Sequence, residues 1–330
     1  MKICIFGAGA VGGYLATRCH LGGAETSVIA RGQNLAAIRS AGLRVQTPEG
    51  ALMAPVAATE DPRELGPQDV VIVAVKAPAL AGVARAIGPL LGPGTAVVFA
   101  MNGIPWWYFY RHGGNLDGTQ LATIDPERAV WEAVGPERAL GCVVYSASEV
   151  VSPGVVRLAQ ANSRLVIGEP DGTVSARATA VADVLTGGGL ATSVTGDIRD
   201  VIWSKLQNNV ASGLMAILTQ CTVDQITARP SCEAAMRGLL AEIIAVAEAL
   251  GRAPSRDIDK VVAHMQALAH KPSILQDLEQ GRKMEIESLY TIILRLAEMV
   301  GVATPKLDLM VTLASLRAEA AGLNDFSSQH

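Results

Sequence analysis

The sequence predicts an α/β fold, with an N-terminal doubly wound sheet and a second, mostly α-helical C-terminal domain. Two observations predict it. A short apolar strand at 2–6 runs into the glycine turn 7–13 and a helix, after which apolar strands keep alternating with helical segments. Strands that alternate with helices form parallel βαβ units. The pattern then becomes helical, so we place the domains at 1–196 and 197–330.

The strands of the first domain are predicted from short apolar runs rich in β-branched residues. They fall at 2–6, 26–30, 69–75 and 96–101, with helices at 14–21 and 80–91. Residues 141–172 change character and predict hairpin strands at 143–145, 154–158 and 164–167, followed by a short strand at 192–194. We expect these hairpin strands to end the sheet as a meander.

The second domain is predicted to consist of long helices. They are expected at 197–214, 232–250 and 283–300. Gly251 and Gly301 stand where the last two of these helices should end, since glycine adopts the left-handed conformation that closes many helices. Residues 324–330 are expected to form a frayed tail.

Composition excludes several classes of protein. Of the 330 residues, 50% are hydrophobic and 18% charged, which is apolar enough for a folded chain and long enough for two domains. The 27 basic and 31 acidic residues form no long run of one sign, so we expect no nucleic-acid partner. No apolar stretch approaches the roughly 20 residues that span a bilayer, so we expect no membrane partner.

The cysteines indicate the compartment. Five widely spaced cysteines with no CxxC pair predict neither a disulfide framework nor a zinc site. We therefore expect a reduced, cytoplasmic protein without a bound metal.

The glycine turn has the spacing G-x-G-x-x-G. In a chain with 33 glycines this spacing alone is weak, but its place between a strand and a helix is typical of Rossmann-like dinucleotide binding. Gly7 permits the tight turn, Gly9 lets backbone approach a pyrophosphate, and Gly12 lets the helix pack closely on the strand. Cofactor contacts are thus expected at Gly7, Ala8, Gly9, Ala10, Val11 and Gly12. The alternative is a turn that binds nothing.

The end of the second strand bears on the choice between NAD and NADP. Arg31 stands where NAD-binding proteins keep an acidic residue. A guanidinium matches the geometry of a 2′-phosphate, so we expect NADP(H), the alternative being a solvated loop arginine. Lys76, at the carboxyl end of a later strand, is expected to add positive charge for the cofactor phosphates.

Six motifs in order give nearly the whole chain a resemblance to the ketopantoate reductase family. They are the glycine turn, Val75–Ala77, Asn102-Gly103, Ser152–Val156, Ile202–Leu206 with Asn209, and Pro272–Asp277 followed by Glu285. The resemblance implies an NADP-dependent oxidoreductase acting on a CH–OH group. Such an enzyme reduces a small-molecule 2-oxo acid to a 2-hydroxy acid, with 2-dehydropantoate (ketopantoate), a precursor in pantothenate biosynthesis, as the leading substrate.

The resemblance also implies roles for individual residues. Lys205 is implied as the general acid toward the carbonyl oxygen, and Glu285 as the second catalytic residue. Substrate contacts are implied at Asn209, Ser273 and Asn102, and cofactor contacts at Asn102, Ala147 and Glu285.

The chemistry makes the same demand on its own. Hydride transfer to a carbonyl carbon leaves negative charge on the oxygen, which calls for a proton donor within roughly 3 Å. Lysine can serve, because its reference pKa of about 10.4 keeps it protonated at neutral pH. Lys205 and Asn209 stand four residues apart on one predicted helix and so share a face. Considered alone, Lys205 would be a surface lysine.

Two features depart from the family pattern. An asparagine commonly stands at the position of Gly213, so a substrate contact is missing, and Asn208 and Ser212 are the candidates to replace it. Five consecutive aromatic residues, 106–110, follow shortly after Asn102. They are expected either to narrow and dry the mouth of the site or to pack the loop against the helical domain or a second subunit.

These features leave alternatives open. One is a dehydrogenase of the same fold for a bulkier or aromatic 2-hydroxy acid. Another is a non-catalytic sensor that binds NADP(H) without turnover. A homodimer formed through the helical domain also stays open.

Overall fold

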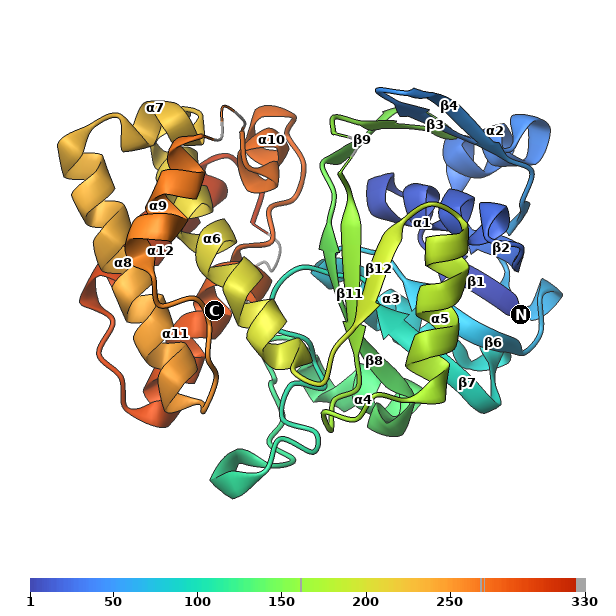
Figure 1. The fold of residues 1–330 in the computed structure, drawn as a ribbon, viewed down its shortest axis with the longest axis horizontal. Helices are drawn as coiled ribbons and strands as arrows, with labels where there is room; N and C mark the ends of the chain where they lie inside the picture. Colours follow the sequence, from blue (N-terminus) through green and yellow to red (C-terminus); the bar gives the residue numbers. More distant parts are fainter. Residues whose placement is uncertain (161, 268, 270, 325–330) are drawn as a thin grey trace. The chain divides into compact units, whose positions relative to one another are not determined.

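The computed structural model describes residues 1–160, 162–267, 269 and 271–324 (Figure 1). Its chain divides into two compact units, Met1–Ile198 and Arg199–His330. Every named strand in the described residues belongs to the first unit, and the second is helical. None of the helices in the described residues is both long and apolar enough to cross a bilayer.

The first unit is built on an eight-stranded sheet with the order β5-β2-β1-β6-β7-β8-β11-β12. Its strands are β1 (Lys2–Phe6), β2 (Glu25–Ile29), β5 (Ala57–Thr59), β6 (Gln68–Val73), β7 (Leu91–Phe99), β8 (Ala139–Tyr145), β11 (Arg164–Gly168) and β12 (Ala191–Val194). The six from β5 to β8 run parallel, β11 is antiparallel to β8, and β12 is parallel to β11. This confirms the predicted doubly wound sheet.

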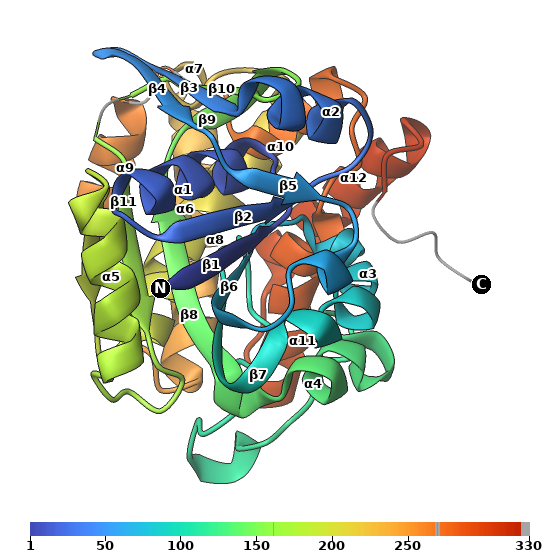
Figure 2. The ribbon, with the colours of Figure 1, turned by 90° about the vertical axis from the view of Figure 1, so that its right-hand side faces the viewer.

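Helices cover both faces of this sheet, because the chain winds outward from β1 in two directions. They are α1 (Ala10–Leu21), α2 (Gly32–Ala41), α3 (Leu80–Ala86), α4 (Ala129–Val134) and α5 (Ala176–Gly187). Right-handed crossovers in opposite directions put helices on opposite faces. Accordingly α1 contacts α5, while α3 contacts α4 (Figure 2).

A second, four-stranded sheet corrects the prediction that the strand at 154–158 belongs to the meander that ends the main sheet. Its order is β4-β3-β10-β9. The strands are β3 (Leu43–Thr47), β4 (Gly50–Ala54), β9 (Ser148–Ser152) and β10 (Val155–Leu158). β10 pairs in parallel with β3, and the sheet covers α1, where a methyl group on Gly13 would lie 3.0 Å from Val156. The physical reason is burial: Val45, Val156 and Leu158 join the core beneath this sheet.

The second unit is a bundle around α8 (Pro230–Ala249). The others are α6 (Ile198–Thr219), α7 (Val223–Thr227), α9 (Ile258–Gln266), α10 (Ser273–Glu279), α11 (Ile292–Val300) and α12 (Pro305–Ala320). The helix α8 contacts α7, α9, α11 and α12. Gly251 and Gly301 have φ values of 72° and 70° just after α8 and α11, as predicted.

The helix expected from residue 283 begins later than predicted. Residue 286 is the first helical one, a π-helical turn follows at Glu287–Thr291, and α11 continues from it. The delay has a cause in the backbone, because the amide of Met284 donates to the carbonyl oxygen of Leu323 at 2.8 Å. Of the predicted tail, Asn324 forms a bridge with Met284, and residues 325–330 lie outside the described part.

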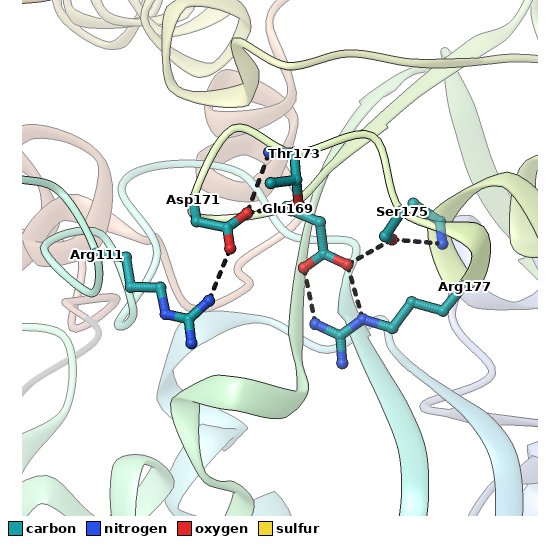
Figure 3. A network of polar contacts seen from close by, with 7 residues as sticks. Arg111, Glu169, Asp171, Thr173, Ser175 and Arg177 are labelled. Atoms are coloured by element: carbon teal, nitrogen blue, oxygen red, sulfur yellow. Dashed lines mark hydrogen bonds and ion pairs between the residues drawn. The ribbon is translucent and has the colours of Figure 1, made fainter.

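A network of ion pairs fixes the segment that follows β11 (Figure 3). The buried carboxylate of Glu169 accepts two hydrogen bonds from Arg177, each at 2.7 Å, and a third from Ser175 at 2.6 Å. Ser175 in turn caps the N-terminus of α5. Nearby, Asp171 accepts from Arg111 at 2.7 Å. The network thus holds together β11, the start of α5 and the loop that carries Arg111.

We expect Glu169→Ala to destabilise the protein by about 2 kcal/mol, because it removes three hydrogen bonds to a buried carboxylate. Thermal unfolding should show a melting temperature lower by several degrees. The control is Glu149→Ala, since Glu149 forms an exposed pair with Arg157, and such pairs contribute about 0–1 kcal/mol. Equal losses in the two variants would contradict the role given to the network.

Candidate active site

The candidate cofactor residues lie at one edge of the main sheet. The order β2-β1-β6-β7-β8 sets the carboxyl ends of five parallel strands side by side. The segments after these strands carry, in that order, Arg31, the glycine turn, Lys76, Asn102 and Ala147. Open α/β sheets bind ligands at the carboxyl ends of their strands, at the point where the strand order reverses.

The geometry of the glycine turn fits a diphosphate. Gly7 has a φ of 103°, and a methyl group on Gly12 would overlap the carbonyl oxygen of Gly7. By contrast, no atom lies within 4 Å of a methyl group placed on Gly9. Gly9 is the N-cap of α1, whose first turn has no acidic residue. Open space before the positive end of a helix is where an anion binds well.

The two cations predicted for the phosphates lie on either side of this turn. Lys76 is exposed and follows Val75, and a methyl group on Gly7 would lie 2.6 Å from the Val75 side chain. Arg31 is the N-cap of α2 and is exposed. Within the described part of the chain, the structure gives the Arg31 guanidinium no ion pair. It is therefore free to meet an external anion.

Asn34 holds the turn in place, and sequence reasoning missed it. Its side-chain nitrogen donates to the carbonyl oxygen of Ala8 at 2.7 Å, and its side-chain oxygen accepts from the amide of Gly154 at 2.7 Å. The residue thus ties the glycine turn to the β9–β10 hairpin. No sequence signal reveals it, because its two partners lie 26 and 120 residues away.

Asn102 and Ala147 occupy exposed positions after β7 and β8. The carbonyl oxygen of Ala147 accepts a hydrogen bond from the amide of Ala159 at 2.9 Å. A backbone contact at Ala147 would therefore have to use its amide or the second lone pair of that oxygen.

In the second unit, α6 presents the predicted catalytic lysine. Lys205 and Asn209 are both half-buried on this helix. Their spacing of four residues, continued by Gly213, sets all three positions along one stripe of the helix. Each step of four residues advances about 6 Å along the axis.

The fold brings two distant segments to this stripe. Ile274, next to Ser273 at the start of α10, would lie 3.2 Å from a methyl group on Gly213. The hydroxyl of Tyr290 occupies the same place, and the charge of Glu285 is near enough to raise the pKa of Tyr290. Ser273 and Glu285, 12 positions apart, therefore belong to segments that meet one turn of α6.

The candidates to replace the missing side chain at position 213 are placed differently. The hydroxyl of Ser212 donates to the carbonyl oxygen of Asn208 at 2.7 Å, so its proton is used within the helix. The side-chain oxygen of Asn208 is buried, with no hydrogen-bond partner in the described residues. Tyr290, which sequence reasoning missed, fills the space above Gly213.

The five aromatic residues form packed clusters. Trp106, Trp107, Tyr108 and Phe109 are at most 2% exposed. Trp106 meets Phe99 and Trp131 edge to face, with ring centroids 5.3 and 5.8 Å apart. A methyl group on Gly141 of β8 would lie 2.8 Å from Trp107. These contacts favour packing over an open ring-lined entrance. The partners Phe99, Trp131 and Gly141 all lie in the first unit, however, whereas the expectation named the helical domain or a second subunit.

Comparison with known proteins identifies the family. The model of "Ketopantoate reductase PanE/ApbA" matches residues 3–172, and that of "Ketopantoate reductase PanE/ApbA C terminal" matches residues 197–318. The chain belongs to the ketopantoate reductase family. As a member it is an oxidoreductase that acts on a CH–OH group with a nicotinamide cofactor.

Relatives of this ketopantoate reductase family member cover its whole length. A 2-dehydropantoate 2-reductase of Mesorhizobium japonicum is 41% identical over 98% of this chain and 99% of its own. A crystal structure from Ralstonia solanacearum MolK2, of a protein assigned as a ketopantoate reductase, is 40% identical with a TM-score of 0.92 and covers 97% and 98% of the two chains.

One structural neighbour has a different substrate. The ternary structure of D-mandelate dehydrogenase with NADH and anilino(oxo)acetate has a TM-score of 0.81 over 98% of this chain and 100% of its own, at 22% identity. The likeness is one of fold, and a fold by itself does not select a substrate.

The two glycines of the turn should respond differently to a methyl group. Gly9→Ala should keep the wild-type melting temperature, because the added carbon meets no atom within 4 Å, yet it should abolish dinucleotide binding measured by fluorescence titration. Gly12→Ala should lower the melting temperature and also abolish dinucleotide binding, since its methyl group would overlap the backbone of Gly7. Dinucleotide binding retained by Gly9→Ala would contradict the assigned phosphate position.

Proposed function

We propose that the chain reduces 2-dehydropantoate to pantoate with NADPH. The observation that carries the proposal is the full-length similarity to the Mesorhizobium 2-dehydropantoate 2-reductase at 41% identity. The placement of the candidate residues supports it. A glycine turn open at Gly9 belongs to the first unit, and a lysine and an asparagine share one stripe of α6 in the second.

We propose that the cofactor is bound by the residues that follow the carboxyl ends of the parallel strands. The amides at the start of α1 would hold the diphosphate, with Gly9 giving it room. Arg31 would pair with the 2′-phosphate, which supports NADP over NAD, and Lys76 would add charge to the phosphates. Asn102 would bind the nicotinamide ribose.

The proposed chemistry needs one proton from the protein. When bound, NADPH supplies the hydride that reduces the carbonyl carbon. Lys205 would donate a proton from Nζ to the carbonyl oxygen, where negative charge develops, and so complete the alcohol. Asn209 and Ser273 would orient the oxo acid, and Glu285 would support the lysine and the cofactor.

The packing of the aromatic residues bears on the substrate. Their rings contact one another, Phe99, Trp131 and His112. Rings already engaged in this way leave little surface to line a pocket for an aromatic acid. We therefore propose the small, polar ketopantoate as the substrate.

The state of the cysteine thiols supports the proposal that the protein is located in the reducing environment of the cytoplasm. None of the five cysteines, all of which lie in the described residues, forms a disulfide. Burial raises the pKa of both Cys4 and Cys19 to about 12, so neither thiol ionises readily. Unpaired cysteines are typical of reducing compartments.

Arg31→Ala should weaken NADPH binding by about 10–100-fold, the equivalent of one charge-assisted hydrogen-bonded pair. NADH binding, which involves no 2′-phosphate, should change by less than about twofold. Titration of both cofactors tests this. Arg39→Ala, on the same helix but bonded to the Ala58 carbonyl oxygen, is the control. Equal losses for the two cofactors would refute the assignment.

Lys205→Ala should lower kcat for ketopantoate by about 10²–10⁴-fold, as expected for loss of a general acid. The affinity for NADPH should stay unchanged. Lys260→Ala, an exposed lysine of α9, is the control.

A substrate panel completes this test. It compares kcat/KM for ketopantoate and phenylglyoxylate, and a preference for the latter would favour an aromatic substrate. Tight NADPH binding without turnover of any 2-oxo acid would indicate a sensor instead.

A further inference from the structure

Tyr290 is a buried polar residue that the proposed chemistry does not use. It lies in the π-helical turn Glu287–Thr291 and is 1% exposed. Among the residues that the structure describes, its hydroxyl has no hydrogen-bond partner. Turns of this π-helical kind occur frequently at functional sites.

Gly213 makes room for this hydroxyl. A methyl group there would overlap the hydroxyl oxygen and would lie 3.3 Å from the ring carbon that bears it. Glycine inside a helix costs about 1 kcal/mol relative to alanine. The backbone does not require it, because Gly213 is absent from the positive-φ glycines of the described chain. Space for the hydroxyl is thus the reason for glycine at this position.

The position of the hydroxyl relates it to the catalytic lysine. Gly213 lies on the stripe of α6 that carries Lys205 and Asn209, two turns beyond the first and one beyond the second. Along this stripe the polar side chains of α6 end at Asn209, and the Tyr290 hydroxyl adds a polar group at the next position, beside Gly213. Ile274, beside Ser273, borders the same glycine.

The phenol stays protonated. Burial raises the pKa of Tyr290 well above its usual value, and the carboxylates of Glu285 and Asp277 raise it further. Asp277 itself accepts a hydrogen bond from Arg282 at 2.7 Å. Throughout the neutral range the hydroxyl is accordingly a donor that lacks an acceptor in the described chain.

We propose that the Tyr290 hydroxyl donates a hydrogen bond to an oxygen of the bound 2-oxo acid, and that Gly213 determines specificity by admitting it. The inference rests on the proposed function. It supplies, from a different helix, the contact that the chain lacks at position 213.

The first test is Tyr290→Phe, which removes only the hydroxyl. KM for ketopantoate should rise about 10–100-fold, as expected for one hydrogen bond to a charged acceptor, while the affinity for NADPH and the melting temperature stay near wild type. Titration of the NADP complex with pantoate should show the same loss without turnover. The control is Ser288→Ala, which removes from the same turn a buried hydroxyl that has no partner in the described part of the chain. Ser288 lies two residues away and on another side of the helix.

A second substrate identifies the oxygen. The acid 3,3-dimethyl-2-oxobutanoate has the shape of ketopantoate but lacks its 4-hydroxyl. If Tyr290 binds that hydroxyl, Tyr290→Phe should raise KM for ketopantoate alone. If it binds the carboxylate or the carbonyl oxygen, KM should rise for both acids. Either result supports the proposal.

A double-mutant cycle tests the role of Gly213. Gly213→Ala should raise KM by displacing the hydroxyl, but it should add little in the Tyr290→Phe background, where the overlapping atom is gone. Additive effects of the two substitutions on KM would refute the role proposed for Gly213.

The failures are distinguishable. Wild-type protein that reduces no 2-oxo acid would refute the proposed function. A wild type that reduces ketopantoate, together with a Tyr290→Phe variant whose KM and pantoate affinity are unchanged, would overturn the inference alone. A lower melting temperature with unchanged KM would likewise show a merely structural hydroxyl.

Discussion

The close approach of α1 to the end of β1 is the constraint on which the rest of the structure depends. Gly12 has no side chain because the carbonyl oxygen of Gly7 fills that space, so the helix begins directly at the edge of the sheet. Gly9, the N-cap of this helix, is left with open space around it. The small sheet covers α1 from outside, and Asn34 joins that sheet to the turn through two hydrogen bonds of 2.7 Å. The proposed cofactor site would thereby be formed largely from backbone, so we expect side-chain substitutions elsewhere to leave it largely intact.

Much of this arrangement could be predicted because its signals are local. Apolar runs predicted β1, β2, β6 and β7 to within a few residues. Because these strands are parallel, Arg31, Lys76 and Asn102, which follow them, lie at one edge of the sheet. The second sheet could not be predicted, because β10 pairs with β3 more than 100 residues earlier in the chain, and strand patterns carry no information about partners. Tyr290 was missed for a related reason. Its relation to Gly213 arises only when α6 and the π-helical turn pack together.

The aromatic residues 106–110 show how composition can mislead about function. Rings near a candidate ligand residue suggest a pocket, yet most of these rings have no exposed face to offer. Trp106 lies between the end of β7 and α4, and Arg111 just beyond them pairs with Asp171 (Figure 3). The segment therefore anchors the loop after β7 to its own unit. Anchoring of the loop also fixes the backbone position of Asn102, which stands at its start.

The pairing of Gly213 with Tyr290 also limits how this chain can evolve. Any side chain introduced at position 213 collides with the phenol oxygen, so the helix cannot acquire a polar group there while the tyrosine persists. If the tyrosine lost its hydroxyl first, position 213 would be vacant and, on the role proposed for that hydroxyl, the ligand would be one contact short. We therefore expect the two positions to change together rather than one at a time.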